Sequence, residues 1–210
     1  NGVVTNGAAV GYTIGNGIST GVMYRINGSN SIWKNNAQAL TVGNGNCTGS
    51  VMNVSGGIVT NVGGLTIGGS GSRSNSLAVD NGGLVCAGAV TLGSGAASAT
   101  YNTMVLTNGG RLNSSGTVSI GGVVGCYSNH AVVYSNSVWN MGGQELDCAY
   151  FGFANVLSIN GGMLTNSAAV YGGNNTAFGN TLLITNGGRM FSTGVGGVGN
   201  ANSYNSTNSV

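Results

Sequence analysis

The chain has 210 residues, of which five are Lys or Arg and three are Asp or Glu, giving a net charge of +2. These few scattered charges form no basic stripe for phosphate contacts, so nucleic acid is not an expected partner. Hydrophobic residues make up 41% of the chain, enough for a continuous core, but no apolar run approaches the roughly 18 residues of a membrane helix.

A repeat of about 26 residues runs through the whole sequence and predicts a repeat architecture. Each unit carries an Asn-Gly-Gly step or its equivalent, whose second position is Gly2, Ser31, Gly57, Gly83, Gly110, Ser137, Gly162 and Gly188. Two residues later every unit has an apolar residue: Val4, Trp33, Val59, Val85, Leu112, Trp139, Leu164 and Met190. Further along each unit lies a second apolar column, which consists of Ile14, Val42, Ile67, Leu92, Ile120, Cys148, Tyr171 and Val198.

Within each unit, apolar and polar residues alternate over short runs that are separated by glycine and asparagine. The runs include, in chain order, Leu65 and Ile67, Leu77 and Val79, Met104 and Leu106, Val118 and Ile120, and Leu157 and Ile159. Period-two alternation of this length is typical of short strands with one buried face, and no segment has sustained helical spacing. The sequence predicts an all-β fold: a parallel β-solenoid of about eight coils with three short strands per coil, as a single domain over residues 1–210.

Asparagine also recurs with the repeat, always two residues before an apolar position: Asn75, Asn102, Asn129, Asn155, Asn180 and Asn208. One interpretation is an asparagine ladder, in which each side-chain amide bonds the next one and satisfies turn backbone. The other is that asparagine recurs only because turns recur. Both interpretations require the same stacked coil.

The sequence begins inside one repeat unit and ends inside another, with Asn1-Gly2 at one end and Asn208-Ser209-Val210 at the other. We expect the ends of the rod to be open strand edges, which readily pair with another chain. Either neighbouring sequence continues the rod, or copies of the chain stack end to end. The expected partner at these ends is therefore either another copy of the chain or the chain's own continuation.

The four cysteines fall in different units and at different phases of the repeat: Cys47, Cys86, Cys126 and Cys148. Stacked residues of adjacent coils lie ~4.8 Å apart, and residues separated by more coils lie too far apart for a disulfide. Cys126 and Cys148 are the nearest pair, but one is expected in a loop and the other in the core. We expect no disulfide, and with one histidine and no Cys-x-x-Cys motif we expect no zinc.

Polysaccharide-cleaving enzymes with a β-helix fold are the enzyme class to consider, because clustered carboxylates carry out their chemistry. Glu145 and Asp147 flank Leu146, which is expected to point inward, so both carboxylates should face solvent. Asp80 should lie two coils away on a different ladder, and His130 is expected to be exposed or in a turn. We therefore expect no catalytic, cofactor-binding or metal-binding residues and no enzyme activity.

Aromatic residues often bind sugars, so their positions in the repeat matter. Trp33 and Trp139 occupy the inward column and are expected to fill the core. Five tyrosines fall nearer the turns and could contribute to a surface for glycans or partners: Tyr12, Tyr101, Tyr127, Tyr150 and Tyr204.

Several segments resemble secreted β-strand-repeat proteins of bacteria, including repeats of the autotransporter passenger type. The similar segments are 75–83, 136–143 and 180–188, together with the Ile-Gly steps at Ile67-Gly68 and Ile120-Gly121. The resemblance implies an extracellular or cell-surface β-solenoid, commonly a stalk, adhesin or matrix component, without catalytic residues.

The leading hypothesis from sequence is an extracellular structural protein that forms a stalk, sheath or filament by continuous or end-to-end stacking. A surface adhesin or glycan-binding passenger is the alternative, and a polysaccharide-active enzyme ranks third.

Overall fold

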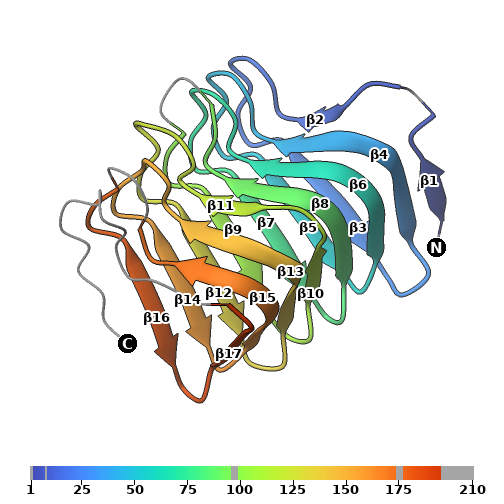
Figure 1. The fold of residues 1–210 in the computed structure, drawn as a ribbon. Helices are drawn as coiled ribbons and strands as arrows, with labels where there is room; N and C mark the ends of the chain where they lie inside the picture. The colour runs from blue at the N-terminus through green and yellow to red at the C-terminus, as the bar shows by residue number, and fades with distance from the viewer. Residues whose placement is uncertain (1, 8, 96–98, 174–176, 195–210) are drawn as a thin grey trace.

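The computed structural model describes residues 2–7, 9–95, 99–173 and 177–194. This part of the chain is all β without a helix, and its two sheets wind as a β-solenoid of about seven turns (Figure 1). One sheet contains β1 (Val3–Thr5), β2 (Tyr12–Ile14), β4 (Ile32–Val42), β6 (Ile58–Ile67), β8 (Leu84–Leu92), β10 (Arg111–Ser114), β11 (Val118–Ile120), β13 (Val138–Cys148), β15 (Met163–Tyr171) and β17 (Arg189–Ser192). The other contains β3 (Met23–Asn27), β5 (Val51–Ser55), β7 (Ser76–Asp80), β9 (Thr103–Leu106), β12 (His130–Tyr134), β14 (Val156–Asn160) and β16 (Thr181–Thr185). The predicted fold class is confirmed.

Each inner strand pairs in parallel with its equivalents one turn earlier and one turn later, so equivalent residues of successive coils stack on one another. The ten-stranded sheet runs β1-β4-β6-β8-β10-β13-β15-β17, with β2 also paired to β4 and β11 paired to both β8 and β13. The seven-stranded sheet runs β16-β14-β12-β9-β7-β5-β3. The first apolar column is confirmed residue by residue, because the register pairs Val4, Trp33, Val59, Val85, Leu112, Trp139, Leu164 and Met190 in that order.

The long strands bend and so cover two sides of the core. β4 and β13 have 11 residues each. Their bends coincide with positive φ angles, 50° at Asn36 and 58° at Ala37 in β4, and 60° at Gly142 and 79° at Gly143 in β13. The first two predicted strands of a coil are merged in β4, β6, β8, β13 and β15, whereas they are separate as β1 and β2 and as β10 and β11.

The second apolar column follows its predicted register from Ile14 to Cys148 and then departs from it. Tyr171 pairs with Asp147 rather than with Cys148. It lies seven residues after Leu164, whereas Cys148 lies nine residues after Trp139, and the register shift between β13 and β15 makes up for only one of these two residues. Tyr171 is therefore one position away from the column to which the spacing assigned it. Val198 lies outside the described residues.

The predicted asparagine ladder forms, which decides between the two interpretations of this column. Asn102 is typical: its backbone N–H and its Nδ2 donate to Oδ1 of Asn129, at 3.1 and 2.9 Å. The same two bonds join Asn75 to Asn102, Asn129 to Asn155 and Asn155 to Asn180, at 2.9 to 3.2 Å. All five side chains are fully buried, and Asn208 lies outside the described residues.

The Asn-Gly-Gly steps form the turns that lead from the seven-stranded to the ten-stranded sheet. At Asn108-Gly109 both residues have positive φ, 48° and 81°, which is the pattern of a type I′ turn. The next residue, Gly110, passes so close to the coil below that a Cβ would lie 2.0 Å from the carbonyl oxygen of Val79. The turn conformation and this close approach together explain why two glycines follow the asparagine.

A second glycine column, directly after the second apolar column, makes room for the asparagine ladder. A Cβ on Gly121 would lie 2.3 Å from Nδ2 of Asn155, and Gly68 and Gly93 are similarly close to Asn102 and Asn129. Ala149 is the exception, since it follows Cys148 in this column and has a φ of 73°.

We predict that Ala149→Gly raises the free energy of unfolding by about 1 kcal/mol, because it relieves a left-handed conformation that disfavours a Cβ. The matched change one coil earlier, Gly121→Ala, should lower it by about 2 kcal/mol or more, because it adds a Cβ against Asn155. Urea unfolding followed by circular dichroism measures both effects. A loss of stability in Ala149→Gly would contradict this account of the column.

Candidate functional site

The carboxylates lie as the alternation predicts and do not form a cluster. Leu146 is fully buried in β13, whereas Glu145 is exposed and Asp147 partly exposed on either side of it. Asp80 lies on the seven-stranded sheet, where its oxygens accept hydrogen bonds from Nδ2 of Asn53 at 3.2 Å and of Asn81 at 3.1 Å. Within the described ranges, no three His, Cys, Asp or Glu side chains lie close enough to hold a metal ion.

His130, the single histidine, is the first residue of β12, and it is exposed as expected. Its register neighbours in the seven-stranded sheet are Thr103 and Val156. Partial burial lowers the pKa of its imidazole. None of its register neighbours is a titratable group that could pair with it in acid–base chemistry.

Both tryptophans lie in the core, as predicted. Trp139 is completely buried, and its Nε1 donates a hydrogen bond of 2.9 Å to Oγ of Ser114. Trp33 is 3% exposed and packs between two tyrosines, with ring centroids 5.0 Å from Tyr12 and 5.0 Å from Tyr24. Neither indole face is free to receive a sugar.

A row of aromatic rings crosses successive coils on the side that joins the two sheets. Tyr127, Phe153 and Phe178 are linked by single parallel bridges and stack with centroid distances of 4.8 and 5.0 Å and interplanar angles of 14° and 2°. Tyr101 adds an edge contact to Tyr127 at 5.5 Å. Sequence reasoning named the two tyrosines but missed both phenylalanines. The signal was available, because each stacked ring lies two residues before a ladder asparagine.

The stacking of this row limits what the rings can bind. Phe153 has a stacked ring on each face, Tyr127 on one side and Phe178 on the other, so neither of its faces is free for a sugar. Phe178 stacks on Phe153 alone among the described residues and is 48% exposed. Tyr150, which is 38% exposed, instead makes an edge contact with Phe151 at 4.6 Å. Tyr204 lies outside the described residues.

All four cysteines are free thiols, and they differ in exposure. Cys47, Cys126 and Cys148 are fully buried, whereas Cys86 is partly exposed on the outer face of β8. Burial raises the pKa of the Cys148 thiol to about 12, and it also raises the pKa of Cys126, although backbone hydrogen bonds at Ala99 and Val123 oppose this shift. The buried thiols therefore act as small core residues.

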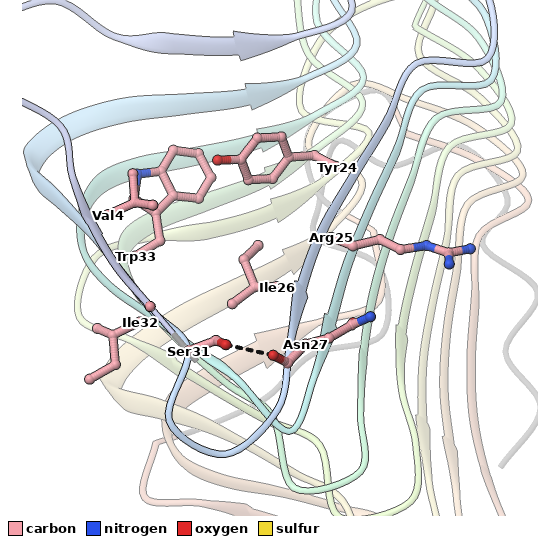
Figure 2. Close-up of a pocket in the computed structure, with 9 residues that line it drawn as sticks. Val4, Tyr24, Arg25, Ile26, Asn27, Ser31, Ile32 and Trp33 are labelled. Carbon is pink, nitrogen blue, oxygen red and sulfur yellow. Dashed lines mark hydrogen bonds between the residues drawn. The ribbon is translucent and has the colours of Figure 1, made fainter.

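The most distinctive open site lies at the N-terminal end of the solenoid. A cavity of about 280 Å³ opens there between β3 and the first strands of the ten-stranded sheet. Its lining is mostly apolar: Figure 2 shows Tyr24 directed toward Trp33, Ile26 extending toward the interior and Arg25 pointing away. On its rim, Oγ of Ser31 donates a hydrogen bond of 2.6 Å to the carbonyl oxygen of Asn27.

Comparison with known proteins identifies no relative. Protein-family models, curated proteins and solved structures were each searched, and none matches the chain. Among the described residues no helix is long and apolar enough to cross a membrane.

The burial pattern predicts one rapidly reacting thiol. At pH 8, a maleimide should label Cys86 quickly and should label Cys47, Cys126 and Cys148 only when the chain unfolds, because their sulfurs are inaccessible and Cys148 stays protonated. Intact-mass spectrometry with and without urea counts the labels. The variant Cys86→Ser should show no fast label, and fast labelling of two or more sites in the native protein would contradict the packing.

Proposed function

We propose that the chain is an extracellular structural protein that forms a stalk, sheath or filament. The stacked coils are themselves the functional element. The observation that carries the proposal is the ladder architecture, in which one interface is repeated from coil to coil. In the described residues, the seven-stranded sheet ends at two strands, β3 and β16, that have no further neighbour. Edge strands with unpaired backbone groups favour addition of another strand.

The interior of the solenoid supports a mechanical role. Apolar columns fill its core, and the asparagine ladder joins coils through bonds between buried amides. Each coil is thus held by main-chain bonds, side-chain bonds and apolar packing on both of its neighbours. Local opening must break several of these at once, which favours resistance to proteolysis and to unfolding of single coils.

The external location rests on the resemblance to secreted bacterial repeat proteins in segments 75–83, 136–143 and 180–188. A nearly neutral surface with five basic and three acidic residues is compatible with such a role, because rods of low charge repel one another weakly.

The second candidate function is that of an adhesin or glycan-binding passenger. One outward row favours it: Thr13, Thr41, Thr66 and Thr91 stack in register on the outer face of the ten-stranded sheet. Regularly spaced hydroxyls can donate to and accept from an extended polar polymer. A glycan array tests this candidate, and saturable binding that is lost when Thr41, Thr66 and Thr91 are all changed to Val would favour it over a purely structural role.

The structural role predicts rods made of many copies. One chain of about seven turns at ~4.8 Å per turn is roughly 34 Å long. Electron microscopy and light scattering of the 210-residue protein over rising concentrations should show particles of constant width whose length grows well beyond this value. Because few charges are involved, the growth should change little with salt. Compact monomers at every concentration would contradict end-to-end stacking.

A further inference from the structure

A groove of about 440 Å³ lies on the outer face of the ten-stranded sheet, between two rows of side chains that follow the axis of the rod. The strands that carry these rows, β8, β10, β13 and β15, lie side by side in the middle of the solenoid (Figure 1). One row contains Arg111, in register with Leu84 on one side and Val138 on the other. The other row, two residues further along the strands, consists of Asn113, Asn140 and Thr165. One wall of the groove is therefore aliphatic with a cation, and the opposite wall carries amides and a hydroxyl.

Arg111 brings a positive charge into this groove without a carboxylate beside it. The side chain is exposed on β10. None of the chain's three carboxylates lines the groove, since Asp80 lies on the seven-stranded sheet and Glu145 and Asp147 lie beyond the bend of β13. A guanidinium group binds a carboxylate through two parallel hydrogen bonds. The groove therefore suits a ligand that supplies the missing anionic group.

The opposite wall suits hydroxyl groups. Asn113 is exposed, and Asn140 and Thr165 are partly exposed. Oδ1 of Asn140 accepts hydrogen bonds from the backbone N–H of Gly142 at 3.0 Å and from Nδ2 of Asn166 at 3.4 Å, and these bonds hold its amide in place. Amides and hydroxyls both donate and accept hydrogen bonds, as the hydroxyls of a sugar do.

The row of Arg111 continues along the rod to a second arginine. After Val138 the register leads to Met163 and then to Arg189. The two arginines are three coils apart, which corresponds to ~14 Å. Two cations in one straight row, with aliphatic side chains between them, suit a linear polymer with repeated anionic groups better than a single small anion.

We propose that this groove binds an acidic polysaccharide, a chain of uronic acid sugars that lies along the rod with carboxylates on Arg111 and Arg189. Its hydroxyls bond to the row of Asn113, and the C–H groups of its rings contact Leu84 and Val138. The inference goes beyond the proposed structural role and does not depend on it. The groove is also separate from the threonine row, which lies on the other side of the strand bends.

Two other kinds of anionic polymer fit the groove less well. A nucleic acid carries a phosphate on every nucleotide, and single strands also bind by stacking their bases on aromatic rings, whereas the groove lining contains no aromatic residue among the described residues. An acidic peptide in extended form binds by adding to an open strand edge. The backbone of β10 is already paired, with β8 on one side and β13 on the other.

Isothermal titration calorimetry of the 210-residue protein with oligogalacturonate tests the site. Saturable binding is expected, and it should weaken as salt is added because Arg111 is exposed to solvent. Neutral dextran oligomers should bind at least about tenfold more weakly, because they lack the carboxylates. Absence of oligogalacturonate binding, or tighter binding of polyglutamate or of a single-stranded oligonucleotide, would overturn the inference.

Matched variants separate the groove from general charge attraction. Arg111→Gln keeps hydrogen-bond donors but removes the charge, so the affinity should fall about tenfold. Arg25→Gln makes the same charge change on the seven-stranded sheet and should stay within about twofold of the parent. Val138→Asp should abolish binding by placing a carboxylate beside Arg111, whereas Val105→Asp, on the other sheet, should not. Circular dichroism establishes that each variant is folded, and equal losses in the two glutamine variants would contradict the proposal.

Cys86 provides a second readout of where the ligand lies. It is next to Asn113, whose Nδ2 is 3.8 Å from its Sγ, and its thiol is partly exposed. A polysaccharide in the groove should cover this thiol, so maleimide labelling of the native protein should slow at least about threefold in saturating oligogalacturonate. An unchanged labelling rate with saturable binding would place the ligand elsewhere and overturn the inference. Rods in the microscope without oligogalacturonate binding would also overturn it, and would leave the structural role intact.

Discussion

The structure depends on the hydrogen bonds of the stacked asparagines. Each coil must turn sharply before it enters the seven-stranded sheet, and this turn leaves a backbone N–H inside the protein. Oδ1 of the asparagine in the next coil accepts a hydrogen bond from that N–H. The same oxygen accepts a second hydrogen bond, from Nδ2 of the asparagine to which the N–H belongs. A buried donor left unpaired costs about 1–3 kcal/mol, so this arrangement removes a penalty that would otherwise recur in each coil.

The ladder also constrains its surroundings. Gly43, Gly68, Gly93 and Gly121 lie so close to the ladder side chains that any Cβ would collide with an amide. The glycines that follow the second apolar column are therefore required by the asparagines one turn later. The glycine column and the asparagine column look independent in the sequence, but their residues contact each other in the structure.

Much of this architecture could be predicted from the sequence, because a parallel solenoid places equal phases on top of one another. The column from Val4 to Met190, the inward tryptophans and the outward Glu145 all follow from phase alone. Tyr171 was assigned wrongly because it is the apolar residue before a glycine in its unit, whereas the register, even after its shift by one residue, pairs it with Asp147. The merging of strands in β4 and β13 depends on bends at left-handed residues, which composition does not specify.

The candidate site was harder to predict for a different reason. Interior positions repeat, but the cavity beside β3 depends on how its lining residues pack, and that information is in the structure rather than in any motif. The structure adds the cavity lined by Ile26 and Trp33, which no motif of the sequence indicates. The aromatic row illustrates the same limit, because its period is visible in sequence but the stacking that hides the ring faces is not.

Hydrogen–deuterium exchange of the ladder amides tests the central claim most directly. The backbone N–H groups of Asn75, Asn102, Asn129 and Asn155 each donate to a side-chain oxygen one coil away. If this ladder supports the fold, these four amides should exchange as slowly as the central strand amides, at a rate set by global unfolding. Exchange as fast as that of an exposed turn, while the strands remain protected, would contradict the account.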